Sequence, residues 1–100
     1  MIKVFLKRFV LAENCQTMML YLKDMRAAAL HQPGYVMGET LMRGENPVEL
    51  LAIGTWISEE HWKAWETAPE RLQLENIVDS LLEGEVQTTI YNIPEEMDKD

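Results

Sequence analysis

The chain contains very little cysteine and histidine. Cys15 is the single cysteine among 100 residues, so an intrachain disulfide, a Cys-x-x-Cys redox pair and a thiolate zinc site are all excluded. His31 and His61 are the only histidines, and neither lies in a cluster with the spacing of metal ligands. We therefore expect a protein with no metal site and no bound cofactor.

Long hydrophobic runs and an excess of basic residues are also missing. Lys3, Lys7 and Arg8 interrupt the first apolar stretch, and no run approaches the ~18 residues that a membrane-spanning helix needs, so we expect neither a signal peptide nor a membrane span. The net charge of -8 repels phosphate backbones and anionic lipid surfaces. The sequence thus predicts a cytoplasmic protein that binds neither nucleic acid nor membranes.

What the chain does contain is a regular succession of apolar patterns. Hydrophobic periodicity and turn residues predict four strands, at Ile2–Leu11, Tyr35–Arg43, Val48–Ile57 and Glu85–Ile93. They also predict one helix over 14–30, a short second helix after Ser58, and a third ending at Gly84. Asn14, Ser58 and a capping box over 67–70 are the expected helix starts.

This order of elements is the βαββ(αα)β plan of a ferredoxin-like α+β domain with an antiparallel four-stranded sheet. The domain is expected over residues 1–93, and residues 94–100 are expected to form a charged, disordered tail. Gly44 to Pro47 fits the turn of a hairpin between the second and third strands.

Both faces of the predicted sheet are apolar. On the third strand, Leu50 and Trp56 share one face while Leu51 and Ile53 share the other, whereas a sheet with one solvated face would alternate apolar and polar residues. Helices can cover one face only. We therefore expect a homodimer in which a second copy covers the other face, forming a dimeric α+β barrel.

A longer motif points to a family. It consists of Trp56-x-Ser58-x-Glu60-x-Trp62-x-x-Trp65, then Ala68-Pro69-Glu70-Arg71, with Gln32-Pro33-Gly34-Tyr35 upstream. In this motif, and in the order of elements from Ile2 to Ile93, the chain closely resembles the antibiotic biosynthesis monooxygenase (ABM) domain family. The resemblance implies a dimeric α+β barrel with a mostly apolar pocket between helices and sheet.

Members of this family include cofactor-free oxygenases of polyphenolic substrates and haem-degrading monooxygenases, so the fold does not select a reaction. The resemblance implies that a haem degrader would carry an Asn on the first strand and a His ten residues beyond the Trp that Trp65 matches. Here these positions hold Lys7 or Arg8, and Glu75. Because a carboxylate is a poor substitute for imidazole on haem iron, we do not expect haem chemistry.

Arg8 and Lys7 are the charged candidates on the first strand, and they point to opposite faces of it. Arg8 lies on the apolar side, so it either stabilises a phenolate or enolate in the pocket or forms a structural ion pair, with Glu75 as a candidate partner. Lys7 and Glu75 are further candidates for contact with the substrate.

Trp62 and Trp65 share one face of the short helix, and their rings either hold a flat aromatic ligand or belong to the core. We expect Trp65 to line the pocket. His61 is a candidate general base, because an imidazole exchanges protons near neutral pH; its alternative is a partly exposed polar position at a helix end, as for His31.

The sequence thus predicts an ABM-type monooxygenase that oxidises an electron-rich aromatic or quinol-type molecule without a cofactor. Arg8 and His61 are its candidate catalytic residues, and Trp65, Trp62, Lys7 and Glu75 its candidate substrate contacts. The alternative is a non-catalytic, stress-related barrel that binds a small aromatic or apolar molecule, or haem. Neither the substrate nor catalysis itself follows from the sequence.

Overall fold

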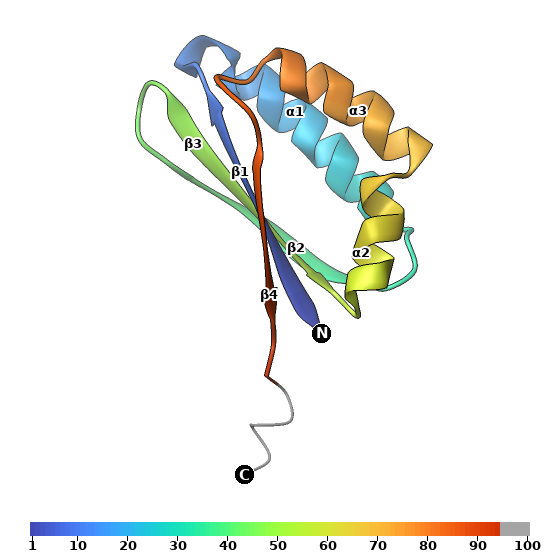
Figure 1. Cartoon of the computed structure of the whole chain (residues 1–100). Helices are drawn as coiled ribbons and strands as arrows, with labels where there is room; N and C mark the ends of the chain where they lie inside the picture. Colours follow the sequence, from blue (N-terminus) through green and yellow to red (C-terminus); the bar gives the residue numbers. More distant parts are fainter. Residues whose placement is uncertain (95–100) are drawn as a thin grey trace.

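The computed structural model describes residues 1–94. Its strands are β1 (Ile2–Val10), β2 (Tyr35–Arg43), β3 (Val48–Trp56) and β4 (Gln87–Asn92). Its helices are α1 (Ala12–Ala29), α2 (Glu59–Glu66) and α3 (Pro69–Ser80). All three helices lie on the same side of one sheet (Figure 1), and none is long and apolar enough to cross a membrane within the described residues.

The sheet has the strand order β2-β3-β1-β4, with every neighbouring pair antiparallel. β1 is central, since its Leu6 pairs with Ala52 of β3 on one side and with Thr88 of β4 on the other. This arrangement confirms the predicted ferredoxin-like α+β fold. The turn predicted between β2 and β3 is also confirmed, with Gly44 at a positive φ of 82°, a conformation that glycine adopts without strain.

Alternation along β1 sorts its side chains between the two faces. Ile2, Val4, Arg8 and Val10 are buried on the helix side, where Leu6 also lies. The odd-numbered residues from Lys3 to Phe9 point to the opposite face. The buried apolar residues form two clusters. One lies around Val10 with α1 and α3, and the other joins Val4 to the tryptophans. Arg8 stands on β1 between these two clusters.

The first helix confirms the predicted apolar stripe but not the predicted cap. Met18, Leu22 and Met25 are buried at the expected spacing. However, α1 begins at Ala12 and not at Asn14, and its N-cap residue makes no side-chain hydrogen bond. The Ala12 N–H instead donates to Asn46 Oδ1 at 3.1 Å. A residue of the distant β2–β3 turn thus satisfies a donor that a local cap would otherwise have taken.

Of the other two predicted helix starts, one is confirmed and one is wrong. The Ser58 cap of α2 is confirmed, since its side chain accepts from the His61 N–H. The capping box over 67–70 is wrong. The Thr67 hydroxyl donates backwards to the Lys63 carbonyl, and the N-cap of α3 is Ala68, with Pro69 next to it. A proline in the first helical turn has no N–H to satisfy, so this helix starts without a polar cap.

The end of the chain follows the prediction less closely. β4 runs over Gln87–Asn92 and is shorter than the expected strand over 85–93. Before it, Gly84 takes a φ of 86°, and the Glu83 N–H donates to the Phe9 carbonyl at 2.8 Å. Most of the predicted disordered tail, residues 95–100, lies outside the described residues.

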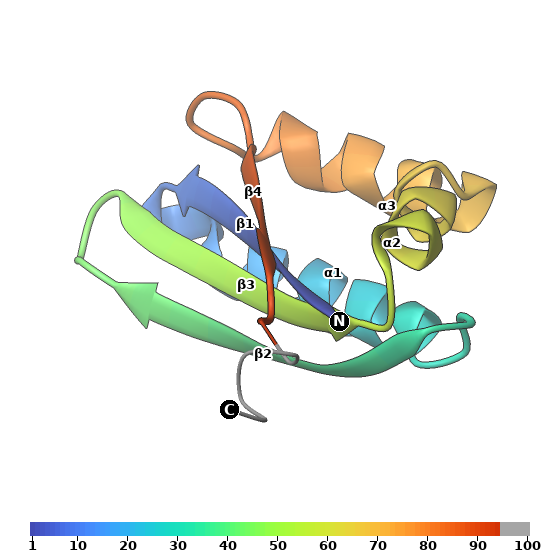
Figure 2. The same cartoon turned by 60° about the horizontal axis from the view of Figure 1, so that its bottom comes forward.

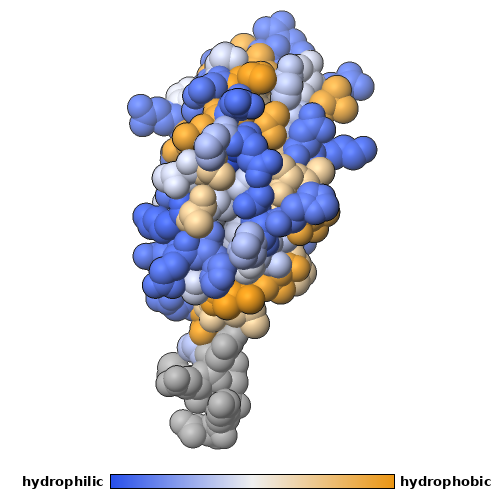
Figure 3. Space-filling view, turned by 90° about the vertical axis from the view of Figure 1, so that its right-hand side faces the viewer, coloured by the Kyte–Doolittle hydropathy of each residue, from blue (hydrophilic) through white to orange (hydrophobic). Residues whose placement is uncertain are grey.

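The face of the sheet away from the helices has no covering layer within residues 1–94 (Figure 2). Register places Phe5, Leu51 and Ile53 on this face, next to Leu41 and Tyr91, which are 50% and 60% exposed. We call this surface the open sheet face. On the helix side, by contrast, hydrophilic residues predominate over much of the surface (Figure 3).

Candidate functional site: a tryptophan cavity with buried arginines

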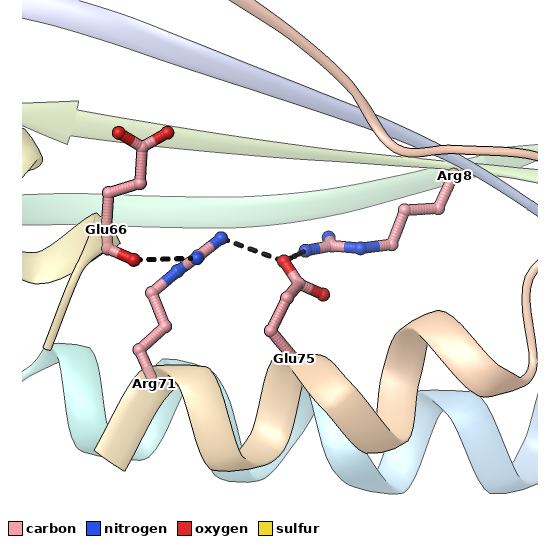
Figure 4. Close-up of polar contacts among 4 residues, drawn as sticks. All are labelled: Arg8, Glu66, Arg71 and Glu75. Atoms are coloured by element: carbon pink, nitrogen blue, oxygen red, sulfur yellow. Dashed lines mark hydrogen bonds and ion pairs between the residues drawn. The ribbon is translucent and has the colours of Figure 1, made fainter. Parts of the chain in front are cut away.

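A buried ion cluster lies between β1 and α3. Arg8 Nη2 and Arg71 Nη2 both donate to Oε1 of Glu75, each at 2.9 Å (Figure 4). Arg71 and Glu75 stand one helical turn apart on α3, which brings their side chains to the same face. Arg71 Nη1 also donates to the Glu66 carbonyl at 3.2 Å. All three charged side chains of this cluster are buried.

The cluster is unbalanced, with two guanidinium groups for one carboxylate. Burial lowers the pKa of Arg71, and the charge of Glu75 opposes that shift. Asp79 lies at the exposed end of the same helix face. Burial raises its pKa, and so does the nearby charge of Glu75. Glu75 is therefore the group on which the burial of both arginines depends.

The raised pKa of Asp79 predicts a pH-dependent effect of replacing it. The folded state binds the Asp79 proton more tightly than the unfolded state, so stability falls as pH rises above 3.8, its ordinary pKa. Asp79→Asn should therefore raise the free energy of unfolding at neutral pH. We expect only about 0.5 kcal/mol, because the side chain is exposed and screened. Urea denaturation at pH 7 and pH 3 checks this, and an equal gain at both pH values would contradict it.

A cavity of about 90 Å³ opens beside this cluster. All three tryptophans of the chain line it, together with Tyr35. Arg8 and Arg71 line it as well, whereas Glu75 is not among the lining residues. The cavity therefore lies between the second apolar cluster and the charged cluster, and combines aromatic walls with buried cationic groups.

The aromatic rings of the cavity form a connected series. Tyr35 meets Trp56 edge to face at a centroid distance of 5.1 Å, and Trp56 meets Trp62 at 5.9 Å. The Arg71 guanidinium then lies over the Trp62 ring, 5.3 Å from its centroid, within the range of a cation–π interaction. The Nε1–H of Trp62 is buried and has no hydrogen-bond acceptor among the described residues.

The rim of the cavity carries a third arginine. Arg26 of α1 donates from Nη2 to Thr40 Oγ1 of β2 at 2.9 Å, and both residues line the cavity. Arg26 is exposed, and its charge acts on Tyr35. Burial raises the pKa of Tyr35, and the positive charge of Arg26 opposes this shift.

The structure brings together three of the predicted site residues, since Arg8, Trp62 and Trp65 line the same cavity. Glu75 lies behind it as the partner of Arg8, which was one of the two interpretations open for that arginine. Lys7 points to the opposite face of the sheet and lines a hollow there with Phe5 and Tyr91.

His61 does not line the cavity, although it neighbours Trp62 on α2. Its Nδ1 lies 2.7 Å from the Ser58 hydroxyl. Its side chain also occupies the space where Gly34, at a positive φ of 84°, would carry a Cβ. These contacts hold the imidazole at the start of α2. His31 follows α1 and is exposed.

Sequence reasoning missed Arg71, Tyr35 and Arg26. Arg71 and Tyr35 are both part of the motif that resembles the ABM family, but the motif assigned neither of them a role in the site. The one available signal for Arg71 was its position four residues before Glu75, which places the two on one helix face. No pattern in the sequence relates Arg26 to Thr40, because the contact joins different elements.

Comparison with known proteins shows similarity of structure only. No family model and no curated protein sequence matches the chain. A conserved protein from Methanosarcina mazei superposes with a TM-score of 0.83 at 22% identity, covering 91% of this chain and 90% of that one. A candidate antibiotic biosynthesis monooxygenase from Nitrosomonas europaea gives 0.84 at 11% identity, covering 93% and 89%.

SnoaB from Streptomyces nogalater, described as a cofactor-independent oxygenase, gives a TM-score of 0.79 at 15% identity over 92% of each chain. These superpositions extend over nearly the whole of both chains, so they match the complete arrangement of sheet and helices and not a shared fragment. The chain therefore has the fold of the antibiotic biosynthesis monooxygenase domain proteins.

Proposed function

We propose that this protein is a cofactor-independent oxygenase of the ABM type, which oxidises an electron-rich aromatic or quinol-type molecule in the tryptophan cavity. The observation that carries the proposal is the placement of Arg8 and Arg71 beside aromatic walls in a cavity of a protein with this fold. Aromatic rings favour a flat ligand through edge-to-face and offset stacking. Buried guanidinium groups favour a ligand that acquires negative charge.

The proposed reaction requires few catalytic groups from the protein. An anthrone-type substrate loses a proton from its CH₂ group, or from the enol form, to give an anion that donates electrons to O₂. One oxygen atom becomes the new carbonyl oxygen of the quinone, and the other leaves as water with the two hydrogens of the CH₂ group. The protein has to exclude bulk water, hold the ring and stabilise the anion. Arg8 and Arg71 supply the last of these.

His61 remains a candidate base within this proposal, but its side chain would have to leave Ser58 to reach the cavity. The positive charge at the cavity offers a simpler route, because a cation near a bound phenol or enol favours its ionised form. Haem fits the cavity poorly, since no histidine is found among its lining residues to serve as an axial ligand.

The proposal includes a homodimer built through the open sheet face. Phe5, Leu51 and Ile53 lie there beside Leu41 and Tyr91, and a large side chain buried by association contributes ~1.5 to 3 kcal/mol. A second copy presents the same surface, so a twofold arrangement would cover both sheets at once.

Oxygen uptake with anthrones and hydroquinones tests the proposal. We expect uptake that depends on the protein and, with oxygen-18 gas and an anthrone, one labelled oxygen atom in the quinone. Arg8→Lys should lower kcat/KM by about a hundredfold, because an ammonium does not reproduce the geometry of a guanidinium. Arg43→Lys is the matched control, since Arg43 does not line the cavity and pairs with Glu49 between β2 and β3.

The same experiment separates catalysis from simple binding. The second candidate function, a barrel that sequesters an aromatic molecule, predicts ligand-induced quenching of tryptophan fluorescence with no oxygen consumption. The three tryptophans lining the cavity make that measurement sensitive to occupancy. If the anthrones and hydroquinones quench the fluorescence and none of them causes oxygen uptake, the oxygenase proposal is contradicted and the binding function is supported.

A further inference from the structure

Positive charge is concentrated at the cavity of an acidic protein. The chain has four arginines, and three of them, Arg8, Arg26 and Arg71, line the cavity. The only carboxylate residue in the lining is Glu39, which is exposed on β2. The whole chain carries a net charge of -8. Three arginines in the lining of a cavity in such a protein favour a ligand that carries negative charge.

Two buried donors at this cavity have no acceptor among the described residues. They are Arg8 Nε and Trp62 Nε1, in side chains of residues only 1% and 2% exposed. Buried N–H groups without a partner are uncommon, because each costs the free energy of its lost hydration. Glu75 does not accept from Arg8 Nε in this structure: its Oε1 receives one donor from each arginine, and its Oε2, which is also buried, receives none.

We propose that the occupant of the cavity is an aromatic acid, whose anionic oxygens accept from Arg8 and Trp62 while its ring lies among the tryptophans. The inference rests on the proposed function only in taking the ligand to be a small aromatic molecule. A carboxylate balances the extra positive charge of two arginines that share one Glu75. The other acidic groups near this cluster, Glu66 and Asp79, act on Arg71 from outside the cavity lining.

The volume of the cavity limits the size of the acid. At about 90 Å³, it is smaller than the roughly 150 Å³ of a cavity known to hold benzene. The enclosed part therefore has room for no more than one ring, and the remaining atoms of the ligand extend past the rim at Arg26 and Thr40. A hydroquinone carboxylate with a single ring is the simplest molecule that meets these conditions.

Calorimetric titration without oxygen tests the inference with a matched pair of ligands, gentisate and its neutral amide, gentisamide. At pH 7 we expect gentisate to bind at least tenfold more tightly. Arg8→Met should reduce this preference to about twofold, whereas Arg43→Met should leave it unchanged. Trp62→Phe keeps an aromatic ring but loses the N–H, and should weaken gentisate binding by about fivefold or more. Because it leaves the ion cluster in place, this variant tests the inference even if Arg8→Met does not fold.

Equal affinity for the acid and the amide, or no binding of either, would overturn the inference. The inference would also be overturned if Arg26→Met abolished the preference for gentisate and Arg8→Met retained it. That result would place the anion at the rim of the cavity. The oxygenase proposal fails separately. A preference for the acid without oxygen uptake supports the anion site and contradicts the oxygenase. Oxygen uptake with equal affinities for acid and amide supports the oxygenase and contradicts the anion site.

Discussion

Glu75→Gln is expected to lower the free energy of unfolding by about 3 to 5 kcal/mol. The substitution removes the carboxylate that Arg8 and Arg71 share, and it leaves two buried guanidinium groups next to each other. Breaking a buried ion pair on one side costs about this much, because the remaining charge loses both hydration and partner. Urea denaturation at a fixed protein concentration measures the change, since dimerisation would make stability depend on concentration.

Glu70→Gln is the matched control. Glu70 lies on the same helix as Glu75 but is exposed, and its carboxylate accepts from the Gln32 side chain at 2.6 Å. An exposed charge of this kind contributes at most about 1 kcal/mol. If both glutamines cost the same, the carboxylate of the buried cluster contributes no more to stability than an exposed one, which contradicts the prediction.

An apolar replacement of the whole cluster separates stability from function. A variant that combines Arg8→Met, Arg71→Met and Glu75→Leu leaves no charge in the cluster. Such replacements are often neutral or stabilising, so we expect the triple variant to be at least as stable as the unchanged protein. Its preference for gentisate over gentisamide should nevertheless be lost. Retention of that preference would show that the cluster does not recognise the anion.

Leu41→Arg should convert the proposed dimer into a monomer. Leu41 lies on the open sheet face and is 50% exposed, so the single subunit tolerates a charge there. In the dimer the same charge would be buried against an apolar surface, at a cost of several kcal/mol. A hundredfold or greater loss of affinity between subunits corresponds to about 2.8 kcal/mol. Sedimentation velocity at micromolar concentration measures the change in mass.

Leu72→Arg is the comparison for this variant, because Leu72 is similarly exposed, at 44%, but belongs to α3 on the helix side. We expect it to sediment like the unchanged protein. If the unchanged protein already sediments as a monomer, the proposed dimer is wrong. If Leu72→Arg dissociates the dimer and Leu41→Arg does not, the subunits contact each other through their helices.

Prediction from sequence succeeded where one element decides the outcome. The alternation of β1 placed Arg8 on the apolar side and Lys7 on the other, because a strand has a strict period of two. The stripe of α1 and the Ser58 cap of α2 were found for the same reason. The Asn14 cap and the capping box of α3 failed because the backbone donors and side chains involved found partners elsewhere, as Ala12 did in Asn46.

The sequence by itself determined the order of the elements, the faces of the strands and the presence of tryptophans and an arginine on the helix side. The tertiary structure alone decided that Arg8 and Arg71 share Glu75, that Tyr35 and Arg26 join the tryptophans at a cavity, and that His61 stays outside it. The physical reason is range. Periodicity and capping preferences act over one turn or one strand, whereas Arg8 and Glu75 lie 67 positions apart and meet only when α3 packs on the sheet.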